Sequence, residues 1–222
     1  MSEQVYKEMV EVMSKRGVVF GGMDIPEFYR VAKALFTPDE AEINNAMPPQ
    51  AFTAGDLAQI MGRDEAELAV TLKQMADKGL CRTHLEGDLR LFRAAPFVPG
   101  IFEFVMMRGT ATDRDKEMAR HIKEYKDAWE ARSPIVVPYP MQRVIAVDEA
   151  IEAKDQIHTY DQVKTYIEEN DQIAVATCYC RHAASLRGED THGMPMQACF
   201  SFGQTAEFAV ECLGAKKLTR QE

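Results

Sequence analysis

Residues 53–93, TAGDLAQIMGRDEAELAVTLKQMADKGLCRTHLEGDLRLFR, form the most regularly patterned stretch in the first half of the chain. Thr53 can cap a helix whose apolar residues recur at helical spacing, and Gly62 interrupts that pattern. The same spacing resumes at about Asp64 and continues as far as Gly79. The stretch therefore predicts two short helices separated by a turn.

A β-hairpin is predicted directly after these helices. Residues 80–85 and 89–92 alternate apolar and polar side chains, and the turn sequence Glu86-Gly87-Asp88 lies between them. Helix, turn, helix and hairpin in this order predict a winged helix, a fold that can bind DNA. The hairpin also carries Cys81 and His84, which we interpret as packing or surface residues because neither has a clustered partner nearby in sequence.

The charges of this segment are a poor match for DNA. Its second helix carries Lys73 and Lys78 among four acidic residues, which disfavours close approach to phosphates. Arg82, Arg90 and Arg93 on the hairpin form one compact basic set and are the candidate DNA contacts. DNA is therefore a disfavoured partner, and a packing or protein-interaction role, including a homodimer through this N-terminal region, is the other interpretation.

Further helices are predicted on both sides of this stretch. Apolar residues at helical spacing predict helices over residues 4–16 and 26–35. Thr37-Pro38-Asp39-Glu40 is typical of a helix N-terminus, with a cap, a proline and acidic residues in the first turn, and this helix should end near Ala46. Residues 112–132 are highly charged and predict an exposed helix.

The sequence Pro134-Ile135-Val136-Val137-Pro138 interrupts the helical pattern and indicates a linker. We therefore expect an α+β chain with a mainly helical, winged-helix-like domain over residues 1–133. A smaller α/β domain that binds a metal or a cluster should follow over residues 134–222. In this second domain the apolar pattern predicts a strand over 143–147, a helix over 160–169 and a strand over 173–176.

Charge and composition narrow the class of protein. The chain has 222 residues and a net charge of -9, which argues against a general binder of nucleic acid or anionic membranes, because those partners need a basic surface. No run approaches the roughly 18 apolar residues of a membrane span, and the first residues have no signal-peptide pattern. We therefore expect a cytoplasmic protein with no membrane partner. Five unevenly spread cysteines are not typical of a secreted disulfide framework.

Three of the five cysteines and two of the five histidines gather near the C-terminus, in Cys178-Tyr179-Cys180-Arg181-His182, at His192 and at Cys199. Two thiols at i and i+2 in an extended or looped segment can turn toward one metal ion or cluster, and a returning loop can complete the set. Glycines and a proline in the return segment suit an irregular backbone around a site. We therefore predict a ligand set of Cys178, Cys180, His192 and Cys199.

The neighbours of these ligands have two interpretations each. Arg181 and His182 can donate hydrogen bonds to sulfur or offset its negative charge, or they can be ordinary polar surface residues. Cys212 lies in an apolar helical stretch, so we interpret it as a core residue with a reserve role as fourth ligand. Met194 and Met196 are interpreted as packing residues.

The run from Cys178 to His182, followed by Gly188, Pro195 and Cys199-Phe200-Ser201-Phe202-Gly203, resembles the C-x-C-R…G…C…P…C-x-x-F-G signature of 4Fe-4S ferredoxin-type iron–sulfur proteins. Those proteins come from anaerobic bacteria and archaea and carry a helical or winged-helix N-terminal part. The resemblance is loose over most of the chain and specific over residues 139–214. It implies a ferredoxin-like electron-transfer protein that binds a 4Fe-4S cluster and serves a partner redox enzyme.

One position departs from the family pattern. The third family cysteine is replaced here by Thr191-His192, and His192 keeps the spacing to Cys199. Cys178, Cys180 and Cys199 therefore carry over, whereas His192 carries over as a substituted ligand. Many relatives continue into a second cysteine-rich segment, while this chain stops at Glu222, so we expect a single cluster. Three cysteines and one histidine suit tetrahedral zinc equally well.

Two other functions remain as alternatives. One is a metal- or redox-responsive transcription regulator that uses the winged helix, and the other is a structural zinc-binding interaction module. An enzyme is less expected, because the sequence has no Gly-rich phosphate loop, no G-x-S-x-G elbow and no H-E-x-x-H motif. A Cys-His nucleophile pair stays open as an enzymatic interpretation.

Overall fold

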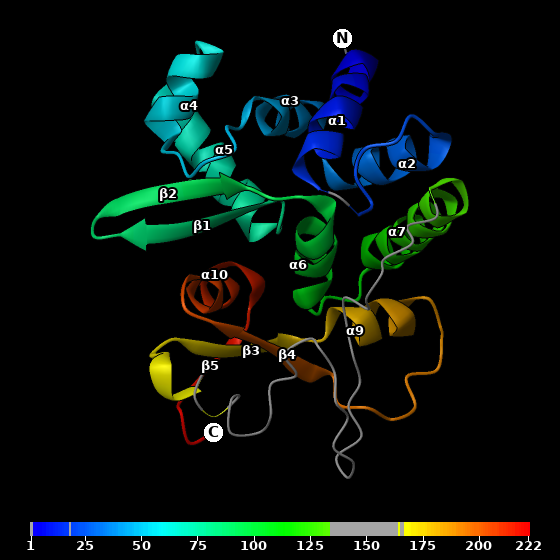
Figure 1. Ribbon diagram of the computed structural model, residues 1–222, viewed down its shortest axis with the longest axis vertical. Helices are drawn as coiled ribbons and strands as arrows, with labels where there is room; N and C mark the ends of the chain where they lie inside the picture. Colours follow the sequence, from blue (N-terminus) through cyan, green and yellow to red (C-terminus); the bar gives the residue numbers. More distant parts are fainter. Residues whose placement is uncertain (1, 18, 134–163, 165–166) are drawn as a thin grey trace, which may run out of the picture.

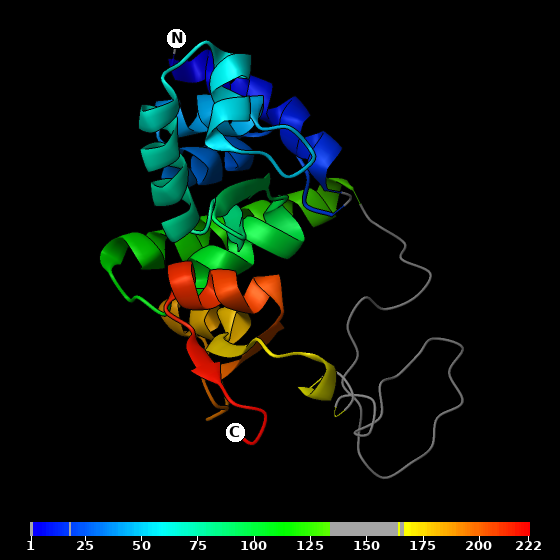
Figure 2. The same ribbon diagram turned by 90° about the vertical axis from the view of Figure 1, so that its left-hand side faces the viewer.

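The computed structural model describes residues 2–17, 19–133, 164 and 167–222 (Figure 1). This part of the chain is a mixed α+β structure in which helices predominate and short strands form two small antiparallel sheets. Figure 1 shows a helical layer, the hairpin, helix α10 (Gln204–Leu213) and a second sheet in succession, and Figure 2 shows this order from the side. Among the described residues, no helix is long and apolar enough to span a membrane.

The first three helices confirm the predictions for this region. They are α1 (Ser2–Arg16), α2 (Pro26–Leu35) and α3 (Pro38–Ala46). At the start of α3, the Oγ1 atom of Thr37 accepts a hydrogen bond from the Glu40 N–H at 3.2 Å, and the Thr37 N–H donates to Glu40 Oε2 at 2.9 Å. This capping box satisfies backbone donors that have no partner within the helix, so α3 begins where the local sequence predicts.

The elements predicted for residues 53–93 are also confirmed. They are α4 (Ala54–Met61), α5 (Glu65–Asp77), β1 (Cys81–Glu86) and β2 (Leu89–Ala94). Gly62 ends α4 in the left-handed conformation, with φ of 64°, which glycine adopts at little cost. The two strands pair antiparallel, from Cys81 opposite Ala94 to Glu86 opposite Leu89. Membership of these elements in the winged-helix class stays a prediction.

The prediction of an exposed helix over residues 112–132 is correct in position and wrong in exposure. Helix α7 spans Asp113–Arg132, and an apolar stripe along it is buried: Met118, Ala119, Ile122, Tyr125 and Trp129. Apolar side chains recur every three or four residues among the charged ones, so one face packs on the core while the rest faces solvent. The Tyr125 hydroxyl donates to the carbonyl oxygen of Gly21 from this buried face.

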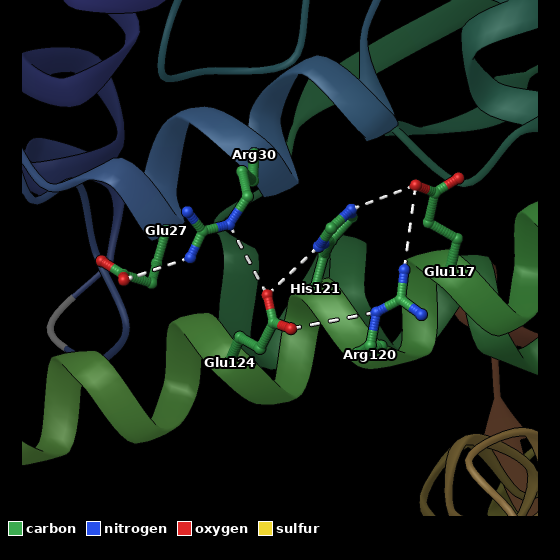
Figure 3. Close-up of polar contacts among 6 residues, drawn as sticks. All are labelled: Glu27, Arg30, Glu117, Arg120, His121 and Glu124. Atoms are coloured by element: carbon green, nitrogen blue, oxygen red, sulfur yellow. Dashed lines mark hydrogen bonds and ion pairs between the residues drawn. The ribbon is translucent and has the colours of Figure 1, made fainter.

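The charged face of α7 reaches α2 through a small ionic network (Figure 3). Arg30 Nε lies 3.6 Å from Glu124 Oε2, and Arg30 also pairs with Glu27 at 3.1 Å. The His121 ring lies between Glu124, at 3.3 Å, and Glu117, at 3.4 Å. Partly exposed ion pairs contribute only about 0–1 kcal/mol each. The buried stripe of α7 therefore accounts for more of the α2–α7 packing than this network does.

Aromatic rings join α7 to the segment that precedes it. Residues Phe97–Ile101 form a π-type turn that leads into α6 (Phe102–Met107). The Phe97 and Phe102 rings stack with centroids 4.7 Å apart, and the Tyr125 ring meets both edge-on at 6.0 and 6.3 Å. This cluster holds α6 against α7 and so fixes the positions of side chains that project from both helices.

The C-terminal part contains β3 (Ile173–Thr177), α9 (Tyr179–Leu186), β4 (Gln197–Phe202), α10 and β5 (Lys216–Leu218). The strands form one sheet in the order β4-β3-β5, with both neighbours antiparallel to β3. The strand predicted over residues 173–176 is confirmed as β3. The strand predicted over 143–147 and most of the helix predicted over 160–169 lie outside the described residues.

Helix α10 connects the hairpin with the C-terminal sheet (Figure 1). Glu211 on α10 lies 2.9 Å from the Arg90 guanidinium and 3.6 Å from Lys73 Nζ. The Phe208 ring meets Phe104 of α6 edge-on, with centroids 5.2 Å apart. Buried residues from both sides of the predicted linker belong to a single hydrophobic cluster. The C-terminal elements are therefore packed directly on the N-terminal ones.

Candidate cysteine site

Three of the predicted ligands lie close together at the end of strand β3. Cys178 directly follows β3 and caps α9, and Cys180 lies in the first turn of that helix. Cys199 is in β4, opposite Ala176 of β3. Because β3 and β4 pair antiparallel, Cys199 comes to lie beside two cysteines that are far from it in sequence.

The three thiols act on one another electrostatically. The Cys199 thiol shares a hydrogen bond with Cys178 and also senses the charge of Cys180. Burial is the main cause that raises the pKa of Cys199. Cys180 is exposed as a residue, but desolvation by neighbouring groups still raises the pKa of its thiol, with a further contribution from Cys178. None of the three is in a disulfide. A bound cation would stabilise the thiolate forms of these residues.

The prediction that Cys178 and Cys180 share an extended or looped segment is wrong for Cys180. The Cys178 N–H donates to the carbonyl oxygen of Met196 at 2.6 Å, which holds this residue at the edge of the sheet. Helix α9 begins at the next residue, and the Tyr179 N–H, which has no partner within the helix, donates to the Cys199 sulfur. The start of a helix favours negative charge, so this position suits thiolates.

Tyr179 links the cysteines to helices from the N-terminal part of the chain. Its hydroxyl hydrogen-bonds with Cys180 and with Glu103 of α6, and it lies 3.3 Å from Lys126 Nζ of α7. Lys126 Nζ also lies 5.3 Å from the centre of the Tyr179 ring and 5.2 Å from that of Phe20. One side of the thiol cluster is therefore lined by a phenol, a carboxyl group and an ammonium group.

Burial disfavours the charged forms of Glu103 and Lys126, the two ionisable groups beside Tyr179. It raises the pKa of Glu103, although the Gly100 N–H donates to Glu103 Oε2 at 2.7 Å and favours the carboxylate. Burial also lowers the pKa of Lys126, against the opposing effect of Glu103. The Lys126 charge in turn acts to lower the pKa of Cys180. The Glu103 charge therefore favours the charged form of Lys126, and the Lys126 charge favours the thiolate of Cys180, in both cases against the effect of burial.

Sequence reasoning missed Glu103, Lys126 and Tyr179 as members of the site. For Tyr179 the one available signal was its place between two cysteines of the motif. Lys126 is one of several lysines in a highly charged helix, and Glu103 is an acidic residue within a short apolar segment. Neither has a spacing or a neighbour in sequence that relates it to the cysteines.

The structure shows how Arg181 and His182, the predicted neighbours of the cysteines, hold α9 in place. The Arg181 guanidinium donates to the carbonyl oxygen of Pro195 in the return segment. The His182 side chain is buried, and its Nδ1 donates to the carbonyl oxygen of Met106 at 2.8 Å, because a carbonyl can only accept. These two contacts attach α9 to the return segment and to α6. A contact of either residue with ligand sulfur stays a prediction.

His192 lies in the segment between α9 and β4 in a left-handed conformation, with φ of 52°. Its side chain is 82% exposed, and Nδ1 lies 3.0 Å from Asp190 Oδ2. The described residues contain no group of three or more His, Cys, Asp or Glu side chains arranged to hold a metal ion. A ligand role for His192 stays a prediction, and it requires the ring to exchange its contact with Asp190 for one with the metal.

The other two cysteines, Cys81 of the hairpin and Cys212 of α10, are both buried. Cys81 is fully buried, and its thiol donates to the carbonyl oxygen of Leu72 at 3.7 Å. Cys212 is buried, as predicted for a core residue, and burial raises the pKa of its thiol to about 12. His84, also on the hairpin, has its Nε2 3.3 Å from Glu86. These contacts support the packing and surface roles expected for all three residues.

Of the hairpin arginines predicted as DNA contacts, Arg90 is bound within the molecule. Its guanidinium contacts Glu211 and also donates to Thr83 Oγ1 at 3.3 Å. Arg82 and Arg93 lie opposite one another in the hairpin and line a pocket against the start of α10. The three arginines therefore do not act as one freely exposed basic surface.

The end of β3 gathers thiol donors, a backbone N–H and a nearby lysine, which are the kinds of groups found around soft metal ions and iron–sulfur clusters. The same thiols suit thiol–disulfide chemistry, since none of the three is in a disulfide and none is fully buried. Comparisons of the chain with protein-family models, with curated proteins and with solved structures found no match.

Proposed function

We propose that this chain binds an iron–sulfur cluster of the 4Fe-4S type and passes electrons to or from a partner redox enzyme. Cys178, Cys180 and Cys199 supply thiolates, and His192 supplies the fourth ligand. The observation that carries the proposal is the convergence of the three thiols at one end of β3. Such a set is not needed for packing, because none of the three is fully buried.

The donor set fits a cluster. In a 4Fe-4S cluster each thiolate binds a separate iron, so the ligands need not meet at one point. Cys199 interacts with both Cys178 and Cys180, so all three thiols lie near enough to one another to contribute to one cluster. A neutral histidine in place of one thiolate would raise the reduction potential.

Residues around the thiols would set the properties of the bound cluster, which supplies one-electron oxidation and reduction. The Tyr179 N–H donates to the Cys199 sulfur, and hydrogen bonds to ligand sulfur raise the potential. Lys126, held against aromatic rings, adds positive charge on the Cys180 side. Cys180 itself is exposed, which leaves one side open to a partner protein.

In this proposal α4, α5 and the hairpin form a winged-helix-like unit that serves protein packing. The ion pair between Arg90 and Glu211 supports this role, because it joins the hairpin to α10 and uses one of the three candidate DNA contacts. The same contact couples the N-terminal helices to the part of the chain that holds the cysteines.

The test is anaerobic purification followed by reconstitution with iron and sulfide. A 4Fe-4S protein should contain about four iron atoms per chain and show broad absorbance near about 400 nm that dithionite bleaches. The variants C178S, C180S and C199S should each lose most of the iron. Cys212→Ala is the matched control, because it removes a buried thiol outside the site and should retain the iron.

His192 is tested separately, because its exposed side chain contacts Asp190 instead of the thiols. His192→Ala should keep the three thiolates and yield a cluster that is lost faster on dilution or has a shifted reduction potential. Colourless protein without iron after reconstitution would contradict the proposal. Stoichiometric zinc without iron would instead support a structural zinc site on the same residues.

A further inference from the structure

A small pocket lies where the hairpin meets the start of α10. Its volume is about 50 Å³, and its walls include Arg82 and Arg93 from the hairpin and Gln204 and Thr205 from the first turn of α10. The aromatic ring of Phe208, which is buried, forms part of the same wall. The pocket therefore has two hairpin arginines on one side and polar side chains of α10 on the other.

The two arginines form a like-charged pair. Arg82 and Arg93 are directly opposite one another in the antiparallel hairpin, so their side chains project from the same face. Burial, with a further contribution from the Arg93 charge, lowers the pKa of Arg82. Like charges directly across a strand pair are destabilising unless a counter-charge lies nearby. The pair therefore favours an anion at this position.

Within the described residues, the side chains of Arg82 and Arg93 have no hydrogen bond or ion pair to a protein group, although their backbones belong to the β1–β2 ladder. Arg90, on the same hairpin, shows the contrast, because it is bound to Glu211 at 2.9 Å. None of the residues that line the pocket is acidic. His84 also lines the pocket, and its Nε2 lies 3.3 Å from Glu86 of its own strand rather than contacting the arginines. The guanidinium donors thus remain available to a ligand.

We propose that this pocket binds a small tetrahedral oxyanion, phosphate or sulfate, between Arg82 and Arg93. Guanidinium groups match the oxygens of such anions with paired, charge-assisted hydrogen bonds. The side chains of Gln204 and Thr205 add neutral donors on the opposite wall. A bound anion would hold the hairpin to α10 beside the Arg90–Glu211 ion pair and strengthen the contact between the two parts of the chain.

The anion site does not depend on the proposed cluster, because no residue of its wall is a cysteine and the experiment uses metal-free protein. Orthophosphate binding is measured by calorimetry at constant ionic strength, with chloride as the balancing anion and sulfate as competitor. Arg82→Gln and Arg93→Gln should each weaken binding by about tenfold or more, because each removes a charge-assisted contact. Lys217→Gln removes one positive charge from exposed β5 and should leave the affinity unchanged.

A second measurement follows the backbone amide signals of Gln204 and Thr205 by NMR, which should shift on addition of phosphate. Arg93 is exposed, so Arg93→Gln should fold normally and keeps the test informative even if Arg82→Gln does not fold.

Equal affinity in Arg93→Gln and Lys217→Gln, or no binding by the parent protein at millimolar phosphate, would overturn the proposal. Tighter binding of glycerol phosphate than of orthophosphate would support it and identify the anion as part of a small phosphorylated molecule. Cys178→Ser should retain phosphate binding, which separates this result from failure of the cluster proposal.

Discussion

Removal of the Tyr179 hydroxyl should raise the pKa of the Cys180 thiol in the metal-free protein. The hydroxyl hydrogen-bonds with Cys180, and this bond acts to lower the pKa of the thiol. A donor favours the thiolate over the neutral thiol, so its loss in Tyr179→Phe leaves the thiolate less stable. The burial that already raises the pKa of Cys180 then acts with less opposition.

The size of this effect follows from the strength of the lost hydrogen bond. A hydrogen bond to a charged group contributes about 1.5–3 kcal/mol, and one pKa unit corresponds to about 1.4 kcal/mol. Cys180 is exposed, so screening by solvent places the effect at the low end of that range. We expect the pKa of the Cys180 thiol to rise, and the rate of its alkylation at pH values below that pKa to fall about tenfold.

The assay is the pH dependence of iodoacetamide alkylation at Cys180, resolved from the other thiols by mass spectrometry of peptides. Tyr29→Phe is the matched control, because the Tyr29 hydroxyl bonds Asp24 at 2.6 Å and lies on α2, away from the cysteines. That control should leave the Cys180 profile unchanged. An unchanged or lower pKa of Cys180 in a folded Tyr179→Phe variant would refute the hydrogen bond to sulfur.

Three further substitutions test the contacts that position the site. Tyr125→Phe removes a buried hydroxyl that donates to Gly21, and the free energy of unfolding measured in urea should fall by about 1–2 kcal/mol; no change would mean that the hydroxyl has no net role. Glu211→Gln weakens the pair with Arg90, and the loss of about 0.5–1 kcal/mol should shrink when unfolding is measured at high salt. Thr37→Ala breaks the capping box of α3 and should cost about 1 kcal/mol by thermal or urea unfolding, whereas Thr37→Ser should preserve stability.

Local signals predicted most of the helices correctly. Thr37 and Thr53 cap their helices through hydrogen bonds to residues three positions ahead, and Gly62 stops α4 through its own backbone conformation. Such contacts lie within one turn, so they can be inferred without knowledge of the rest of the fold. The error at α7 arose because its high average charge obscured an apolar stripe at helical spacing, Met118 to Trp129.

Prediction of the candidate site required knowledge of long-range contacts as well as of local sequence signals. The grouping of Cys178 and Cys180 is evident in sequence, and Cys199 was related to them by the motif, but the helical start at Tyr179 was not expected. At that start the Cys178 N–H donates to the carbonyl oxygen of Met196, a residue of the return segment. This contact joins residues that no local sequence signal relates.

The sequence by itself determined the order of the helices and the hairpin, the α+β class and the residues that can donate sulfur. Caps, turns and periodicity are set by neighbours along the chain, so they are visible before the fold is known. Tertiary structure alone decided that Lys126 and Glu103 lie beside Tyr179 and that Arg82 and Arg93 face the start of α10. Those positions follow from packing of α6, α7, the hairpin and α10, because burial of apolar faces brings together polar residues that no sequence spacing relates.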